Sequence, residues 1–209
     1  CGALPVTRTS SLAELIVNAN PAITVQPAAT QTICENASVS IEITATGDDL
    51  TYQWYQDGEL ITEANVTGTT TNEINISNAT IANDGIYTCI VSAPCGSPIT
   101  SNSSTLTVNP TTVVSTHPIG RTKCEGDNVT FTVVANGGNL VYDWTLDNVS
   151  LGLPSSSSLT INNLDIATHE GTYRCIVTGD CGVITTNPAV LTIKAITIIT
   201  APVADIVDT

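Results

Sequence analysis

The sequence repeats at an interval of about ninety residues, and this repeat restricts the possible folds more than any other feature. Cys34, Trp54 and Cys89 recur 90, 90 and 86 positions later, as Cys124, Trp144 and Cys175. In both copies a Cys-Gly pair follows, at residues 95–96 and 181–182. Cysteine and tryptophan positions that recur at a nearly constant period predict an array of one folded unit.

Four segments follow from the repeat. Residues 19–109 (the first copy) and 110–194 (the second copy) are each expected to form a whole domain. Residues 1–18 match the end of a copy and are expected to be the last strand of a preceding repeat. Residues 195–209 match the opening of a copy and are expected to be the first strand of a following repeat. The sequence is therefore interpreted as a segment of a longer fibre.

Alternating apolar and polar residues predict strands in both copies. Val39–Ala45 and Val129–Val133 are each expected to be one half-buried strand of a two-layered sandwich. The pairs Asp57-Gly58 and Asp147-Asn148 suit tight hairpins, because Gly and Asn accept a positive φ at low cost. The first copy has five extra residues, around 65–72, and this insertion is expected to change the surface and not the core.

The residues around the tryptophan and the later cysteine resemble those of immunoglobulin-like domains. Tyr52-Gln53-Trp54 and the string from Asp84 to Cys89 recur in register at 142–144 and 170–175. The resemblance implies an all-β chain of tandem immunoglobulin-like β-sandwich domains with tyrosine corners at Tyr87 and Tyr173. A linker with no Gly/Ser tract favours domains arranged end to end. The expected cores are Ile43, Trp54, Tyr87 and Cys89, with Ile76, and Val133, Trp144, Tyr173 and Cys175, with Ile161.

The cysteines depart from the immunoglobulin pattern. Ile43 and Val133 occupy the positions where that pattern has its first core cysteine. Cys34 and Cys124 lie nine residues earlier. The usual disulfide across the sandwich is therefore not expected, and the later cysteines, Cys89 and Cys175, are predicted to be buried thiols that pack as small apolar side chains.

Two pairings remain for the other cysteines. A bridge needs Cα atoms within about 7 Å, so it cannot join the two poles of one domain. Cys34 is expected at the pole of the first domain that meets the second, and Cys181 at the pole of the second that meets the first. We therefore predict an inter-domain disulfide Cys34–Cys181, with Cys95, Cys124 and Cys1 bonded to neighbouring repeats. The alternative is a local bond in each copy, Cys89–Cys95 and Cys175–Cys181.

The composition excludes several classes of function. The chain has 5 Lys plus Arg against 19 Asp plus Glu and a net charge of −14, so it lacks the basic surface that nucleic acids require. Recurrent cysteines suit an oxidising, extracellular compartment. The apolar run 196–203 is shorter than the roughly 20 residues of a membrane span. We expect no membrane span in this segment and a location at the cell surface.

A second resemblance concerns the style of the repeat. Each copy has Cys-Glu-x-x-x-Val-x-Ile/Phe early, then Tyr-x-Trp, then Cys-Gly. This style resembles the immunoglobulin-like repeats of very large cell-surface adhesins of Bacteroidota, including those linked to gliding and type IX secretion. The resemblance implies a secreted adhesin stalk or filament whose partners are neighbouring repeats of the same chain.

Catalytic and metal roles find little support in the sequence. His117 and His169 do not recur in the other copy and have no nucleophile beside them, so they are interpreted as exposed loop residues and no enzyme is expected. Asp48-Asp49 is a candidate calcium site at a domain junction, although such a site needs six or more oxygen ligands. The alternative to a structural spacer is a module that binds a glycan or a protein through polar loops or residues 65–72.

Overall fold

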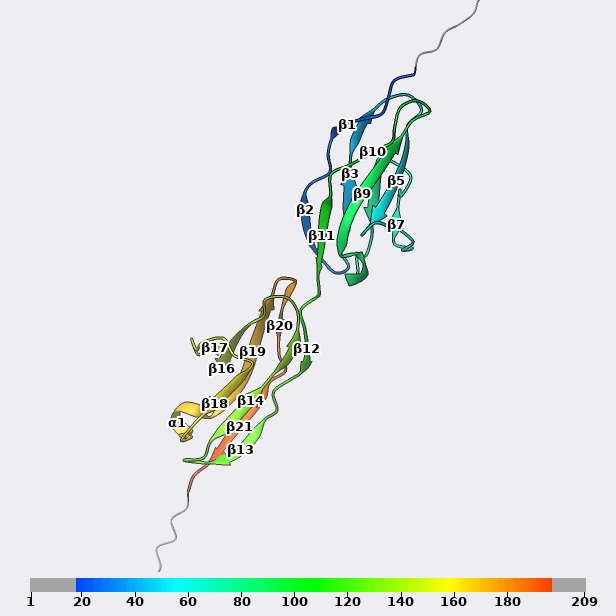
Figure 1. The fold of residues 1–209 in the computed structure, drawn as a ribbon. Helices are drawn as coiled ribbons and strands as arrows, with labels where there is room; N and C mark the ends of the chain where they lie inside the picture. The colour runs from blue at the N-terminus through cyan, green and yellow to red at the C-terminus, as the bar shows by residue number, and fades with distance from the viewer. Residues whose placement is uncertain (1–17, 197–209) are drawn as a thin grey trace, which may run out of the picture. The chain divides into compact units, whose positions relative to one another are not determined.

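The computed structural model describes residues 18–196, which form two compact units whose regular secondary structure is almost entirely β-strand (Figure 1). The first unit holds the described residues as far as Gln31, together with Ser38–Ser77 and Asp84–Thr107. The second unit holds Thr32–Ala37, Asn78–Asn83 and the described residues from Val108 onward. Two short pieces of the first copy thus cluster with the second unit. The predicted terminal segments 1–18 and 195–209 lie almost wholly outside the described residues.

The first copy contains eleven strands and one short 3₁₀ turn. In chain order they are β1 (Ala22–Val25), β2 (Thr30–Cys34), β3 (Val39–Glu42), β4 (Thr44–Thr46), β5 (Thr51–Gln56), β6 (Glu59–Leu60), β7 (Val66–Thr67), β8 (Glu73–Ile76), η1 (Ile81–Asn83), β9 (Gly85–Ser92), β10 (Ile99–Thr100) and β11 (Ser104–Asn109).

The second copy contains ten strands and one turn of helix. They are β12 (Val113–Thr116), β13 (Arg121–Cys124), β14 (Val129–Thr132), β15 (Val134–Asn136), β16 (Val141–Leu146), β17 (Val149–Ser150), β18 (Ser158–Ile161), α1 (Ile166–His169), β19 (Gly171–Gly179), β20 (Gly182–Thr185) and β21 (Ala189–Lys194). The all-β fold class predicted from the sequence is confirmed, whereas the end-to-end arrangement stays a prediction.

The larger sheets of the two copies have the same topology. Their strand orders are β2-β11-β9-β5-β6, with β10 beside β9, and β13-β21-β19-β16-β17, with β20 beside β19. The smaller sheets differ, because β3-β8-β7 has three strands and β14-β18 has two. The first copy also pairs β1 with β4, and the second pairs β12 with β15. The predicted hairpins are confirmed by positive φ angles at Asp57 (51°), Gly58 (84°), Asp147 (50°) and Asn148 (68°).

Two details of the strand prediction were wrong. Val39–Ala45 is not one strand, because the ladder breaks at Ile43, whose amide donates to the carbonyl of Asn72 (3.0 Å). The chain then pairs with β1 instead of β8. Ile161 is only half-buried, and Leu159 is the buried apolar residue of β18.

The insertion in the first copy also reaches the core, contrary to expectation. It forms β7, which pairs Val66 with Ile76 and buries the Val66 side chain to 8% exposure. Its carbonyls at Thr69 and Thr71 accept hydrogen bonds from the backbone amide and indole N–H of Trp54, both at 2.9 Å. Residues 65–72 are therefore part of the packed structure around the tryptophan.

Candidate functional site

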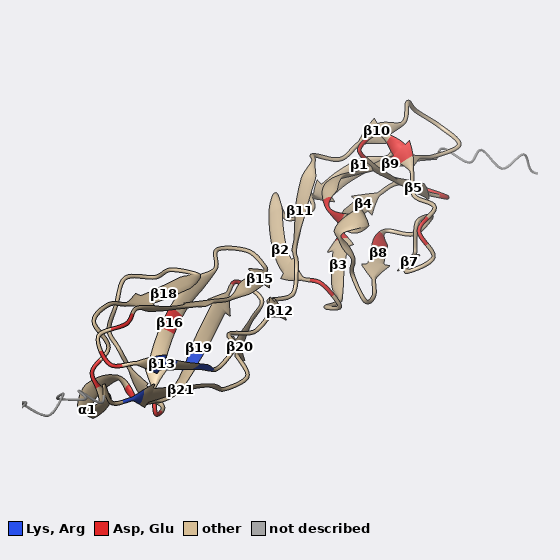
Figure 2. Ribbon diagram, turned by 90° about the horizontal axis from the view of Figure 1, so that it is seen from below, with Lys and Arg blue, Asp and Glu red and all other residues tan. Residues whose placement is uncertain are grey.

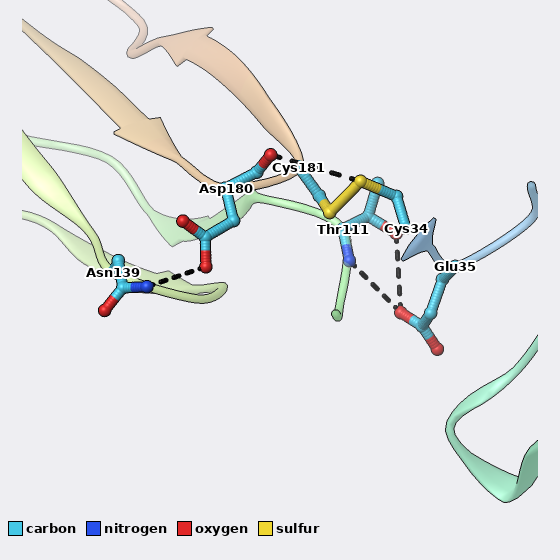
Figure 3. The surroundings of a disulfide bond; sticks show 6 residues. All are labelled: Cys34, Glu35, Thr111, Asn139, Asp180 and Cys181. Atoms are coloured by element: carbon cyan, nitrogen blue, oxygen red, sulfur yellow. Dashed lines mark hydrogen bonds between the residues drawn. A yellow bond between two sulfur atoms is a disulfide. The ribbon is translucent and has the colours of Figure 1, made fainter. Parts of the chain in front are cut away.

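Cys34 and Cys181 form a disulfide, which is the pairing favoured by the sequence (Figure 3). Cys34 ends β2, and Cys181 lies in the turn between β19 and β20. Their Cα atoms are 5.6 Å apart, and 147 positions separate them in the sequence. This separation lies within the range that a disulfide spans. Both cysteines belong to the second unit.

Hydrogen bonds hold the Cys34 side of the site in place. Glu35 donates its backbone N–H to the carbonyl of Asn109 at 2.9 Å. Its carboxylate accepts from the backbone N–H (3.2 Å) and the hydroxyl (3.4 Å) of Thr111. Figure 3 shows Glu35 reaching the Thr111 backbone beside the disulfide. The residues around Cys34 are thus tied to segment 109–111 by polar contacts, and Cys34 itself is tied to Cys181 by the covalent bond.

The Cys181 side is organised by the hairpin itself. Asp180 donates its N–H to Gly138 (2.9 Å), and its carboxylate accepts from the side-chain amide of Asn139 (2.8 Å). The carbonyl of Cys181 accepts from the N–H of the buried Thr112 (3.1 Å). Gly179 has no side chain here because a Cβ would collide with the Thr112 hydroxyl. The hairpin therefore presents Cys181 on a backbone that is fixed on both sides.

The other described cysteines are free thiols of two kinds. Cys89 and Cys175 are fully buried, and burial raises the pKa of each to about 11. A buried thiol with a raised pKa is a poor nucleophile. Cys95 and Cys124 are exposed. The alternative local bonds, Cys89–Cys95 and Cys175–Cys181, are not formed, while Cys1 lies outside the described residues.

The residues expected in the cores are buried, except Ile161, which is half-buried. Ile43, Trp54, Tyr87 and Cys89 are at most 1% exposed, and Val133, Trp144, Tyr173 and Cys175 at most 3%. The Tyr173 hydroxyl donates to the carbonyl of His169 (2.8 Å), which is the geometry of a tyrosine corner. Burial raises the pKa of Tyr87 above its usual range and that of Tyr173 to about 12.

The two histidines and the Asp48-Asp49 pair serve local backbone contacts. His117 Nδ1 accepts from the N–H of Asn187 (3.1 Å), and His169 Nδ1 accepts from that of Asp165 (3.0 Å). Asp48 accepts from the N–H of Ala19 (2.7 Å). Within residues 18–196 no group of three or more His, Cys, Asp or Glu side chains is placed to hold a metal ion. No helix among these residues is long and apolar enough to cross a membrane.

Two features of the structure were not predicted from the sequence, one at the disulfide and one away from it. The contact between Glu35 and Thr111 was one, although the glutamate after the first cysteine of each copy (Glu35, Glu125) was a visible signal. The other is an apolar hollow of about 430 Å³ beside β18, lined chiefly by Leu146, Leu151, Leu153, Ile161 and Tyr173. No sequence pattern indicated it, because its lining comes from three separate segments.

Comparisons with known proteins agree with this architecture. Residues 20–92, about a third of the chain, match the family model described as "Immunoglobulin domain". No curated protein matches the sequence. Among solved structures, an I-band fragment of titin is 21% identical with a TM-score of 0.73, and the match covers 85% of this chain and 67% of the fragment.

Two further structures are similar over most of the chain. Extracellular domains 3–5 of Drosophila OTK are 20% identical with a TM-score of 0.61, and the match covers 83% of this chain and 62% of that one. Immunoglobulin domains 1–4 of Sidekick-1 are 19% identical with a TM-score of 0.68, and the match covers 85% of this chain and 49% of that one. The chain therefore spans about half of the Sidekick-1 fragment. Residues 20–92 carry an immunoglobulin-like domain, and the described chain has the fold of tandem immunoglobulin structures.

Proposed function

We propose that this chain is a structural segment of a secreted surface filament or adhesin stalk, of the kind found in the large cell-surface adhesins of Bacteroidota. Its partners are neighbouring immunoglobulin-like repeats of the same long protein, and its role is mechanical and non-enzymatic. The domains are 19–109 and 110–194, with parts of adjacent repeats at 1–18 and 195–209. The supporting observation is the Cys34–Cys181 disulfide.

The disulfide changes the path that tension takes along the chain. A pull on the two ends of the chain passes from Cys34 to Cys181 directly through the sulfur atoms. The 147-residue separation is then bypassed, which shields on the order of 500 Å of extended chain at about 3.4 Å per residue. Closing a loop of this length also stabilises the folded state by about 5 kcal/mol from chain entropy. Both effects suit a filament under shear.

Single-molecule stretching of the full chain, held by its two ends, tests this role. With the disulfide intact, we expect complete unfolding to release roughly 500 Å less length than after reduction. Cys34→Ser should lose this difference, and Cys124→Ser, at the matching position of the second copy, should keep it. An equal final extension for the oxidised and reduced chains would show that the bond does not carry the pull.

A second candidate function is a module that binds a glycan or a protein. The observation that favours it is the apolar hollow beside β18, not residues 65–72, which are engaged in their own strand and in bonds to Trp54. A glycan array probed with the intact chain tests this function directly. Binding that Leu153→Ser abolishes would support the module, and an array without specific binders would remove its glycan form.

A further inference from the structure

The backbone that presents Cys34 to its partner is repeated at Cys124. Each cysteine ends a strand and is followed by a glutamate whose N–H bonds a carbonyl at the end of the copy, at 2.9 Å for Glu35 and 3.0 Å for Glu125. The N–H two positions after each cysteine donates at 2.8 Å to the next loop, and the N–H three positions after it returns to the carbonyl of the cysteine at 3.1 Å. The two cysteines therefore occupy equivalent positions, each held by the same set of backbone hydrogen bonds.

The two positions differ in what meets the sulfur. Cys34 is half-buried and bonded to Cys181, whereas Cys124 is exposed and free. The Cys124 thiol is thus held in the geometry of a disulfide partner without having one among residues 18–196.

The partner half of the bond is also repeated. Cys95-Gly96 stands six residues after Cys89, as Cys181-Gly182 stands six after Cys175. Both glycines have a positive φ, 89° at Gly96 and 128° at Gly182, so both turns need glycine. The turn at Cys95 is wider, because four more residues separate its strands. Cys95 is exposed and free, like Cys124.

Charge permits contact between these two surfaces. Cys124 lies opposite Lys194 on β21, and Arg121 and Lys123 precede it on β13. The nearby acids are Glu125, Asp127 and Asp165, the last of which follows Leu164, whose backbone bonds Gly126 and Asp127, so this surface carries as many basic as acidic residues. Figure 2 shows the described Lys and Arg residues only on strands of the second copy.

The loop beside Cys95 is acidic. Asp48 accepts from the N–H of Ala19, and the next residue, Asn20, packs against Gly96. The Asp48-Asp49 pair therefore lies near the Cys-Gly turn, in a first copy that has no Lys or Arg at all. In a chain with a net charge of −14, most surfaces of one molecule repel those of another. The surface around Cys124 does not repel the acidic surface beside Cys95.

We propose that Cys124 is a covalent attachment site for the Cys-Gly turn of another immunoglobulin-like unit. The turn that occupies it is Cys95-Gly96 of a second molecule of this chain. The two thiols lose two protons and two electrons as the S–S bond forms. An external disulfide such as oxidised glutathione accepts them and is reduced to two thiols. The proposal rests on the filament role proposed above, because it identifies a partner for that filament. Its test does not depend on how the chain bears force.

The test oxidises the full chain, carrying Cys1→Ser, in a buffer of reduced and oxidised glutathione and maps the cross-linked peptides. Cys1→Ser removes the one cysteine outside the described residues. Two equally reactive thiols that pair at random give Cys95–Cys124 as about half of the products. We expect this peptide to exceed roughly 80% of the intermolecular bonds in the folded chain. In denaturant it should fall to about one eighth, because the thiols of Cys89 and Cys175 are then exposed as well and the folded surface no longer directs the pairing.

Two sets of variants complete the design. Cys95→Ser or Cys124→Ser should each stop head-to-tail growth, leaving monomer and slowly formed symmetric dimer. Reversal of Lys123 and Lys194 to Glu should slow linkage several-fold, and added salt should slow the unmodified chain in the same way. Random pairing in the folded chain, or glutathione adducts without Cys95–Cys124 peptides, would overturn the proposal. Either result leaves the stretching test of the Cys34–Cys181 bond unaffected.

Discussion

The two copies build the same larger sheet but cover the smaller sheet differently. In the first copy, β7 pairs with β8 and places Val66 over Ile76, which is 1% exposed. In the second copy β18 has no such neighbour, and the matching Ile161 lines the apolar hollow. The register identifies the match, because Ile76 faces Val39 across the sheet as Ile161 faces Val129. A short insertion in one repeat therefore decides whether the sheet edge is packed or open.

This difference leaves the hydrogen bond of the tryptophan indole in place in both copies. The indole N–H of each tryptophan is bonded to a carbonyl of the following segment, Thr71 for Trp54 (2.9 Å) and Ser156 for Trp144 (3.0 Å). Phe131 stacks on Tyr173 in the second core, with ring centroids 4.8 Å apart. The repeat thus preserves the tryptophan, tyrosine and cysteine core and varies at its edge, where the two copies acquire different surfaces.

The largest expected contrast lies between the equivalent cysteines. Cys34→Ser removes a bond that closes a 147-residue separation, so it should lower the free energy of unfolding by about 4–5 kcal/mol. Cys124→Ser changes an exposed free thiol and should alter it by less than about 0.5 kcal/mol. Chemical denaturation of both variants under oxidising conditions measures the pair. Equal losses would mean that the two positions are not distinguished by the bond.

Replacement of either tryptophan should lower the free energy of unfolding by a similar amount. Trp54→Ala and Trp144→Ala each empty the centre of a core and should each cost about 3–5 kcal/mol. Circular dichroism during chemical denaturation follows both variants, with the remaining indole reporting on the other copy by fluorescence. A cost under about 1 kcal/mol for either residue would contradict the equivalence of the cores.

Shortening the two matched isoleucines probes the sheet edge. Ile76→Val trims a fully buried side chain and should cost about 1 kcal/mol, the usual value for this change. Ile161→Val trims a half-exposed one and should cost less than about 0.5 kcal/mol. The midpoints of chemical denaturation resolve this difference, provided that the free energy of unfolding depends on denaturant concentration with the same slope in both variants. A larger loss at Ile161 would indicate that the hollow is closed in solution.

The last expected effect concerns the stability that the buried thiols contribute at alkaline pH. Burial raises the pKa of Cys89 and Cys175 from 9.0 to about 11, so the unfolded chain releases these protons first as pH rises. Their contribution to stability is present below about pH 9 and declines toward pH 11. Denaturation measured at a series of pH values should show this decline equally in both copies. The double variant Cys89→Ala, Cys175→Ala should retain only the part of this decline in stability that is due to the buried tyrosines. An unchanged decline in the double variant would exclude the thiols as its source.

Local patterns in the sequence determined the repeat, its strands and its core. Alternation places Ile41 and Phe131 inward because successive side chains of a strand point to opposite faces. The turns at Asp57-Gly58 and Asp147-Asn148 were predictable because few residues accept a positive φ. The buried state of Cys89 and Cys175 followed from their place in the repeat, two positions after a tyrosine in a strand with one buried face.

Only the tertiary structure decided the features made by segments far apart in the chain. The strand break at Ile43 depends on the carbonyl of Asn72, and the difference in burial between Ile76 and Ile161 depends on Val66, so neither could be read from a local period. The position of Cys34 beside Cys181 was argued from the poles of a resembled fold, but its fixation by Glu35 and Thr111 was not. Such contacts depend on where the chain returns in space, which periodicity within a strand does not encode.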